Sequence, residues 1–211
     1  MIKTGRILLT VCSALAFLPA AGAATVFTFN LDACSGTCGA APFGTVSLAQ
    51  TGAGGVGTFV TVIETLAANE RFAGSGAGDA LEFNVASPIT LGNLTAGFAV
   101  GPAPDTASAF GTFLESITCT VCQGGNANNP AGPLSFTVSS AGGVTIADFT
   151  VNAGGYYFAS DIVGTNGNTG NVATNGPGGI IQSTPEPATL ALTGLGLLGL
   201  GAFGRRLRRS K

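Results

Sequence analysis

Apolar and polar residues alternate along most of the chain between residues 25 and 163. The segment ALEFNV, for example, places Leu81, Phe83 and Val85 on one side of an extended chain and Glu82 and Asn84 on the other. Such period-2 alternation of β-branched and aromatic residues is typical of half-buried strands. It predicts about nine strands, at residues 25–30, 44–50, 56–66, 80–86, 94–100, 112–119, 133–139, 144–151 and 156–163.

Clusters of Gly, Asn and Pro separate the predicted strands, as in QTGAGGVG and QGGNANNPAGP. These residues supply the backbone angles that tight turns require. Between residues 24 and 184 no ten-residue stretch shows helical periodicity. Many short strands with regular turns favour an all-β fold, an antiparallel β-sandwich or jelly-roll-like single domain over residues 24–165. Residues 166–184, rich in Gly, Asn and Thr, are predicted to form an edge segment followed by a linker.

The N-terminal segment, residues 1–23, has the pattern of a secretory signal peptide. Lys3 and Arg6 precede the apolar run ILLTVCSALAFL, and small residues end the segment at Ala23. We therefore expect export, with signal peptidase as a processing partner that cuts after Ala23 or Ala24.

A second apolar run lies near the C-terminus. As a helix, the 16 residues from Ala188 to Phe203 would span about 24 Å, slightly less than a membrane core of about 30 Å. Cationic residues directly after it mark the cytoplasmic side of a membrane. The pattern predicts a single-pass transmembrane helix at 188–203, followed by a basic stop made of Arg205, Arg206, Arg208 and Arg209.

Charge is distributed unevenly between these ends and the middle of the chain. Of eight basic residues, Arg71 is the only one between Ala24 and Pro187, whereas all ten acidic residues lie there. One cation against ten acids gives this stretch a formal charge of −9. Such a stretch cannot neutralise a run of phosphates, which excludes nucleic acid as a partner. The chain also has no histidine, which excludes His-based triads, Cys-His dyads and His-containing zinc sites.

Four cysteines lie beyond the signal peptide, in the motifs CSGTC and CTVC. Exported domains meet an oxidising compartment, so we expect disulfides rather than a four-cysteine zinc site or a redox-active pair. Four cysteines allow three connectivities. The short spacing favours Cys34–Cys38 and Cys119–Cys122, and cross-pairing of the two motifs is the alternative.

Acidic residues offer the remaining candidate chemistry, because glycoside hydrolysis needs two carboxyl groups. The candidates are Glu64, Glu70, Asp79, Glu82 and Glu115, and their positions on turns or on the polar faces of strands predict solvated side chains. We therefore expect no catalytic residue and no enzymatic activity. The loop residues Asp161, Asn166, Asn168 and Asn171 loosely resemble a calcium loop but include too few carboxylates. We expect no metal and no cofactor.

The C-terminal segment resembles a known signal. Pro185-Glu186-Pro187, then ATLALTGLGLLGLGAFG, then RRLRR are similar to the PEP-CTERM sorting signal of Gram-negative bacteria, over residues 185–209. The resemblance implies that an exosortase, a membrane peptidase or transpeptidase, recognises Pro185, Glu186 and Pro187. It also implies export through the inner membrane to the cell surface or extracellular matrix, together with exopolysaccharide in biofilm or floc.

These features together predict a non-enzymatic surface or matrix protein associated with exopolysaccharide. A glycan-binding β-sandwich module is the first alternative, although no Trp and only two Tyr are present to stack on sugars. A two-carboxylate glycosidase is the second alternative.

Overall fold

The computed structural model describes residues 24–174 and 182–183. Within these residues the regular secondary structure is almost entirely β-strand, with one three-residue 3-10 helix, η1 (Ile146–Asp148). No helix in this part of the chain is long and apolar enough to cross a membrane. The strands are β1 (Ala24–Asp32), β2 (Gly44–Thr51), β3 (Phe59–Leu66), β4 (Arg71–Phe72), β5 (Leu81–Val85), β6 (Thr90–Gly92), β7 (Phe98–Val100), β8 (Asp105–Ala107), β9 (Gly111–Phe113), β10 (Glu115–Cys119), β11 (Leu134–Ser139), β12 (Phe149–Thr150), β13 (Phe158–Val163), β14 (Thr169–Thr174) and β15 (Gln182–Ser183).

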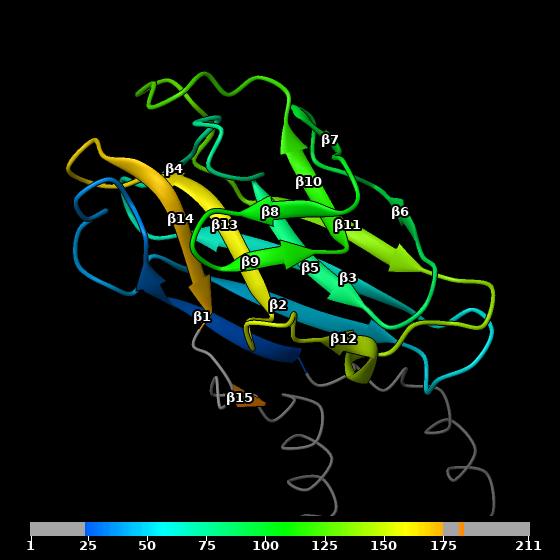
Figure 1. Cartoon of the computed structure of the whole chain (residues 1–211). Helices are drawn as coiled ribbons and strands as arrows, with labels where there is room; N and C mark the ends of the chain where they lie inside the picture. Colours follow the sequence, from blue (N-terminus) through cyan, green and yellow to red (C-terminus); the bar gives the residue numbers. More distant parts are fainter. Residues whose placement is uncertain (1–23, 175–181, 184–211) are drawn as a thin grey trace, which may run out of the picture. The chain divides into compact units, whose positions relative to one another are not determined.

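Thirteen strands belong to one antiparallel sheet (Figure 1). Its main path runs in the order β6-β11-β3-β2-β1-β14-β13-β5-β10-β7, and β4, β12 and β15 pair beside that path. The two end strands come close to closing the sheet, because the segment between β6 and β7 lies along β11, where the Thr95 amide donates to the Ser135 carbonyl (3.0 Å). The structure therefore confirms the all-β, antiparallel class and shows one continuous, nearly closed sheet.

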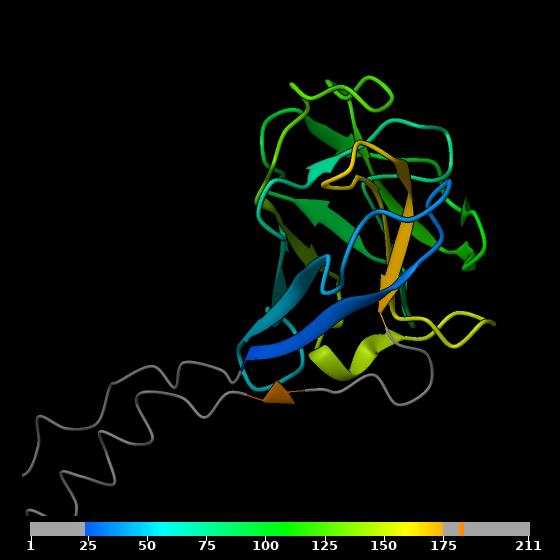
Figure 2. The same ribbon diagram turned by 90° about the vertical axis from the view of Figure 1, so that its left-hand side faces the viewer.

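Strand β1 connects the two halves of this sheet. Its first residues pair with β2 from Ala24 to Phe29, and its last residues pair with β14 up to Asp32. The register with β14 shifts between Phe29 and Leu31, and an irregularity of this kind bends a strand. Figure 2 shows β1, in dark blue, running from the strands of one half towards β14, in gold.

The main core lies between the two halves. Phe83 of β5 packs on Phe136 of β11, with ring centroids 5.6 Å apart. Phe27 of β1 packs edge-on against Phe158 of β13 at 5.0 Å. These pairs join residues far apart in sequence, so burial of large apolar rings holds the two halves together.

A second, smaller core lies on the other face of β13 and β14. The β8–β9 hairpin lies in front of these strands in Figure 1, and its Phe110 and Phe113 belong to one buried cluster with Ala159 and Ala173. Ala159 and Ala173 are paired across β13 and β14, and small side chains there let the hairpin approach closely. The hairpin therefore covers a sheet face that would otherwise meet water.

Several predicted boundaries need correction. The segment 166–184 is not only an edge segment and linker, because Thr169–Thr174 forms β14, which lies between β1 and β13 and is almost wholly buried. The predicted strand 144–151 is mainly η1 followed by the two-residue β12. The short strands β4, β6 and β8 were not predicted. The predicted signal peptide at 1–23 and membrane helix at 188–203 lie outside the described residues.

Candidate functional site

The outer face of β5, β10, β13 and β14 carries acidic and polar side chains beneath the β8–β9 hairpin. Because Phe83 points into the main core, its neighbour Glu82 points to the opposite face. The strand register places Glu82 beside Ser116 of β10. It also places Asp161 of β13 directly opposite Asn171 of β14.

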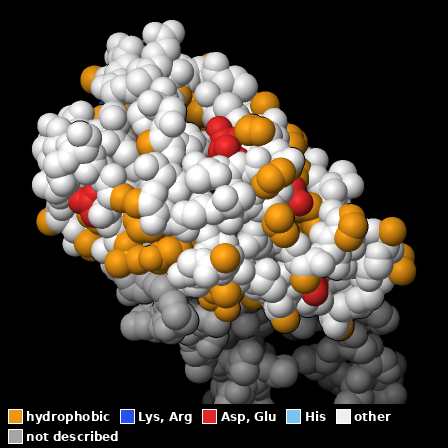
Figure 3. All heavy atoms as spheres, viewed as in Figure 1, with side chains coloured by type: hydrophobic (Ala, Val, Ile, Leu, Met, Phe, Trp, Pro, Cys, Tyr) orange, Lys and Arg blue, Asp and Glu red, His pale blue; other side chains and the backbone are white. Residues whose placement is uncertain are grey.

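We define the acidic cluster as Asp79, Glu82, Asp105, Asp161 and Asn171. Glu82 and Asp161 are 0 % exposed and Asn171 is 1 % exposed. Asp79 and Asp105 are half-buried, so the cluster reaches solvent through these two carboxyl groups. Figure 3 views this side of the molecule and shows acidic side chains but no Lys or Arg.

Two acids of the cluster are well supplied with hydrogen-bond donors. Asp79 accepts from the hydroxyls of Ser116 (2.5 Å) and Thr118 (2.8 Å). Asp161 accepts from both the amide and the hydroxyl of Ser75, at 2.7 to 2.8 Å. These bonds satisfy carboxyl oxygens that burial has partly or wholly removed from water.

The other buried members of the acidic cluster, Glu82 and Asn171, each have one oxygen without a hydrogen-bond partner. Glu82 Oε1 accepts from the Asp79 amide (3.0 Å), but Glu82 Oε2 has no partner. Asn171 Nδ2 donates to the Ala77 carbonyl (2.8 Å), but Asn171 Oδ1 has no partner. An acceptor left unsatisfied in the interior costs about 1–3 kcal/mol, so these two oxygens require an explanation.

Burial and the neighbouring acids raise the pKa values of Glu82, Asp79 and Asp161. Burial raises the pKa of Glu82 to about 9; the Asp79 amide opposes the shift, and the nearby Asp105 and Asp79 carboxyls add to it. Burial also raises the pKa of Asp79. Hydrogen bonds from Ser116 and Thr118 lower this pKa, and the nearby Asp105 carboxyl group raises it further. Burial raises the pKa of Asp161 as well. The hydrogen bonds from Ser75 lower this pKa, and the Asp79 charge makes a smaller contribution that raises it.

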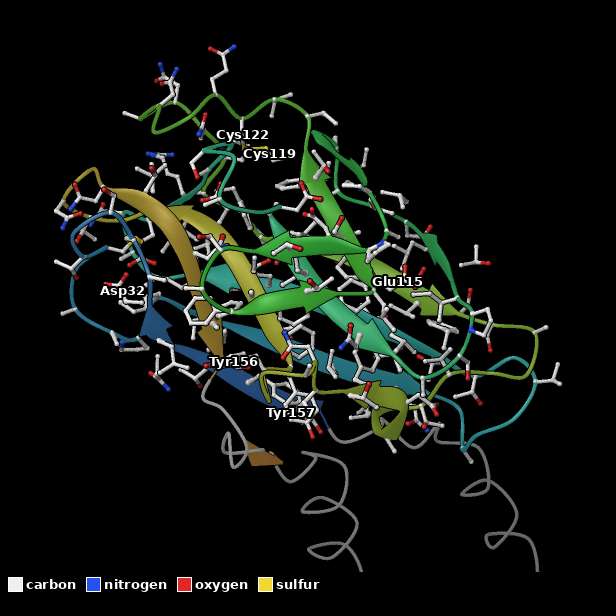
Figure 4. The ribbon with its side chains drawn as sticks, viewed as in Figure 1. Asp32, Glu115, Cys119, Cys122, Tyr156 and Tyr157 are labelled. Atoms are coloured by element: carbon white, nitrogen blue, oxygen red, sulfur yellow. A yellow bond between two sulfur atoms is a disulfide. The ribbon has the colours of Figure 1, made fainter. Side chains whose placement is uncertain are left out.

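Two further acids are also buried, contrary to the prediction that these carboxylates are solvated. Glu64 is 0 % exposed and Glu70 is 2 % exposed. Glu64 points into the main core from β3, and burial raises its pKa well above the usual value, with a smaller opposing effect of Ser160. Burial raises the pKa of Glu70 to about 7, opposed by the Ala67 backbone and reinforced by the Asp32 charge. Glu115, labelled in Figure 4, is half-buried, and this burial raises its pKa.

The cysteines form two local disulfides, Cys34–Cys38 and Cys119–Cys122. The second pair is labelled in Figure 4. Asp32 organises the first loop, because its carboxylate accepts from the amides of Cys34 (2.8 Å) and Cys38 (2.9 Å). Asp32, Cys34 and Cys38 have ligand-type atoms within 4.8 Å of one another, but sulfurs joined in a disulfide are not thiolates and do not hold a metal in the usual way. This group is therefore a structural loop.

The four residues of the calcium-like loop divide between two places. Asn166 and Asn168 both donate to the Thr37 carbonyl, at 2.5 and 2.9 Å, and so brace the first disulfide loop. Asp161 and Asn171 belong to the acidic cluster instead. The structure does not bring the four together as one ligand set.

Asp105, Asp161 and Asn171 are the members of the cluster that the sequence reasoning did not connect with Glu82. Alternation placed Glu82 on the face opposite Phe83, but it contained no sign that the 105–113 hairpin covers that face. Asp105 lies in β8 of this hairpin, and its carboxyl interacts with those of both Asp79 and Glu82. Only the tertiary position of the hairpin could have revealed this contact.

Comparison with known families concerns the C-terminal segment. Residues 183–209 match the model of the PEP-CTERM protein-sorting motif. The chain carries a PEP-CTERM sorting motif. This motif implies an exported protein that passes through the membrane and is recognised by exosortase. Pro185, Glu186, Pro187 and the predicted basic stop fall within the match and lie outside the described residues. No curated protein and no solved structure matches the chain.

Proposed function

We propose that the PEP-CTERM signal delivers this domain to the cell surface or extracellular matrix of a Gram-negative bacterium. There it works without catalysis, in association with exopolysaccharide in a biofilm. The single observation that carries this proposal is the sorting motif at residues 183–209. The predicted signal peptide and the formal charge of −9 between Ala24 and Pro187 fit an exported, soluble domain.

The surface of the described residues favours a matrix component over a module that stacks sugars on aromatic rings. Tyr156 packs on Phe110 at 5.2 Å between ring centroids, and Tyr157 packs on Phe27 at 4.9 Å (Figure 4). The exposed large apolar residues of this part of the chain are aliphatic, Val56 being the most exposed at 88 %. A flat aromatic platform for sugar rings is therefore not among the described surface features.

The non-catalytic part of the proposal draws on the burial of the acids. Glu82 and Asp161 are 0 % exposed, so a polysaccharide chain cannot reach their carboxyl oxygens without displacement of the covering hairpin. With no histidine in the chain, the remaining routes to hydrolysis need two accessible carboxyl groups at a defined separation. We expect the protein to release no new reducing ends from the producer's exopolysaccharide. A release that disappears in Asp79→Asn or Glu115→Gln would contradict this part.

Delivery is tested at the mature C-terminus. We expect mass spectrometry of protein from exporting cells to show a new C-terminus near Pro187, and the full C-terminus ending at Lys211 when exosortase is deleted. Replacing Pro185, Glu186 and Pro187 by alanine should have the same effect as the deletion. Pro177→Ala is the matched control, since it removes a proline upstream of the matched residues 183–209. Protein that still ends at Lys211 in normal cells would refute exosortase processing.

A further inference from the structure

Two buried oxygen atoms of the acidic cluster lack any hydrogen-bond partner, namely Glu82 Oε2 and Asn171 Oδ1. Their residues are 0 % and 1 % exposed. The orientation of the Asn171 amide is fixed, because Nδ2 donates to the Ala77 carbonyl at 2.8 Å. Turning the amide over would bring Oδ1 against that carbonyl oxygen, so Oδ1 must face the cluster as an acceptor.

Both side chains lie against Gly78. A Cβ atom at Gly78 would lie 2.6 Å from Glu82 Oε1, 2.9 Å from Asn171 Nδ2 and 3.1 Å from Asn171 Oδ1, so the carboxyl group of Glu82 and the amide group of Asn171 lie close together there. The backbone of Gly78 does not have the positive φ that favours glycine, so the close approach of these two side chains, rather than the backbone conformation, is what requires glycine here. A side chain at position 78 would push the Glu82 carboxyl group and the Asn171 amide group apart.

The charge of this region is not neutralised by basic side chains. The carboxyl group of Asp105 interacts with those of Glu82 and Asp79. Arg71, the single basic residue between Ala24 and Pro187, donates to the Asn129 carbonyl (3.0 Å). A proton shared by Glu82 and Asp105 would satisfy one carboxyl oxygen but would leave Asn171 Oδ1 without a donor. A cation satisfies carboxylate and amide oxygens together.

We propose that the acidic cluster binds a calcium ion, held by Glu82, Asp105 and the Oδ1 atom of Asn171, with Asp79 beside them. All these ligands are oxygens, which suit hard cations and not zinc or copper. They come from two strands, a hairpin and a loop, and calcium tolerates such irregular sets at about 2.3–2.6 Å whereas magnesium requires a near-octahedral shell.

Binding requires a modest contraction of the site. The carboxylates of Asp79, Glu82 and Asp105 do not form a set within 4.8 Å, unlike the atoms of Asp32, Cys34 and Cys38. Asp105 is half-buried on the hairpin and is the ligand placed to move inwards. The ion would thereby fasten the β8–β9 hairpin to the sheet, a role that does not depend on the exosortase pathway.

The test uses the full-length chain in non-ionic detergent, stripped of metal with a chelator. Isothermal titration with calcium chloride should give one site with a Kd of about 10⁻⁴–10⁻³ M, the range of extracellular calcium modules. Circular dichroism should show a rise in Tm of about 3–10 °C in about 10 mM calcium. Magnesium should bind more than about tenfold more weakly.

Two variants and one control locate the ion. Glu82→Gln removes a ligand charge. Gly78→Ala keeps every acid but forces the Glu82 and Asn171 side chains apart. Each variant should weaken calcium binding more than about tenfold. Glu115→Gln removes one half-buried acid from neighbouring β10 and should bind like the parent. The proposal is overturned if the parent chain binds no calcium or if both cluster variants bind normally. Equal weakening by Glu115→Gln would likewise overturn it, and equal affinity for magnesium would overturn the choice of ion.

Discussion

Replacing Glu64 by glutamine removes a carboxyl group that lies in the main core. Glu64 faces inwards from β3, with Val46 and Leu134 as its cross-strand neighbours. Glu64 is 0 % exposed, and neither of its carboxyl oxygens has a hydrogen-bond partner. The nearby Ser160 hydroxyl lowers the pKa slightly, but that hydroxyl donates to the Ala80 carbonyl at 2.7 Å. Burial therefore dominates, and it favours the neutral acid.

The direction of the pKa shift sets the pH dependence of stability. The folded pKa of Glu64 lies well above the ordinary value of 4.5. The stability associated with the neutral acid is thus fully present below about pH 4.5 and is lost as the pH rises towards the folded pKa. While the pH stays below that folded pKa, the loss approaches about 1.4 kcal/mol per pH unit. Between pH 5 and pH 7 this one group would cost the parent up to about 3 kcal/mol of unfolding free energy.

Urea unfolding of the parent and Glu64→Gln at pH 5, 6 and 7 measures this effect directly. We expect the free energy of the variant minus that of the parent to increase by about 1 kcal/mol or more per pH unit. The unpaired amide of glutamine adds a constant penalty of about 1–3 kcal/mol, which shifts the difference but not its slope. Glu115→Gln is the matched control and should show a weaker slope because Glu115 is half-buried. A difference that stays flat from pH 5 to pH 7 would refute the reasoning.

Two further predictions concern the first disulfide loop and its contact with β14. Asp32→Asn should lower the unfolding free energy by about 1 kcal/mol. The reason is that an amide cannot replace both oxygens that accept hydrogen bonds from Cys34, Cys38 and Thr37. An unchanged urea midpoint above pH 5 would contradict the role of Asp32 in stabilising this loop. Hydrogen bonds lower the pKa of Asp32 despite partial burial, so its contribution is present above pH 3.8 and is lost as the pH falls through the folded pKa. Gly170→Ala should destabilise by about 1–3 kcal/mol, since φ is +150° and the new Cβ would lie 2.6 Å from the Cys34 Cα. Gly142→Ala, with no atom within 4 Å, is its control and should change the unfolding free energy by less than about 0.5 kcal/mol.

Much of the strand content could be predicted from the sequence, because alternation is a local property of the chain. The segments at 44–51 and 134–139 were predicted almost to the residue, since each has one face in the core and one partly exposed. The prediction failed for β14, where Gly, Asn and Thr suggested a linker. That strand is covered on one face by the main core and on the other by the hairpin and the acidic cluster, so its composition reflects close packing of small side chains rather than solvent.

Prediction from local alternation was even less able to reveal the candidate site. Glu82 was interpreted as a residue on the polar face of a strand, and Asp161 as a residue of a turn-rich loop; for Glu82 the alternation itself was interpreted correctly. What alternation cannot show is whether another segment covers that face, because this depends on contacts between residues far apart in the chain. Asp105 and Asn171 meet Glu82 only after the hairpin and β14 have taken their places.

The sequence by itself determined the β-class, the uneven charge and the PEP-CTERM signal at the C-terminus. Each of these is written in consecutive residues, as a period, a composition or a motif. The tertiary structure alone decided that β1 bends the sheet onto itself and that β14 is central. It also decided that three carboxyl groups lie under a hairpin, which contributes a fourth. Burial and mutual repulsion of charges arise between distant segments, and for that reason they became visible only in the folded chain.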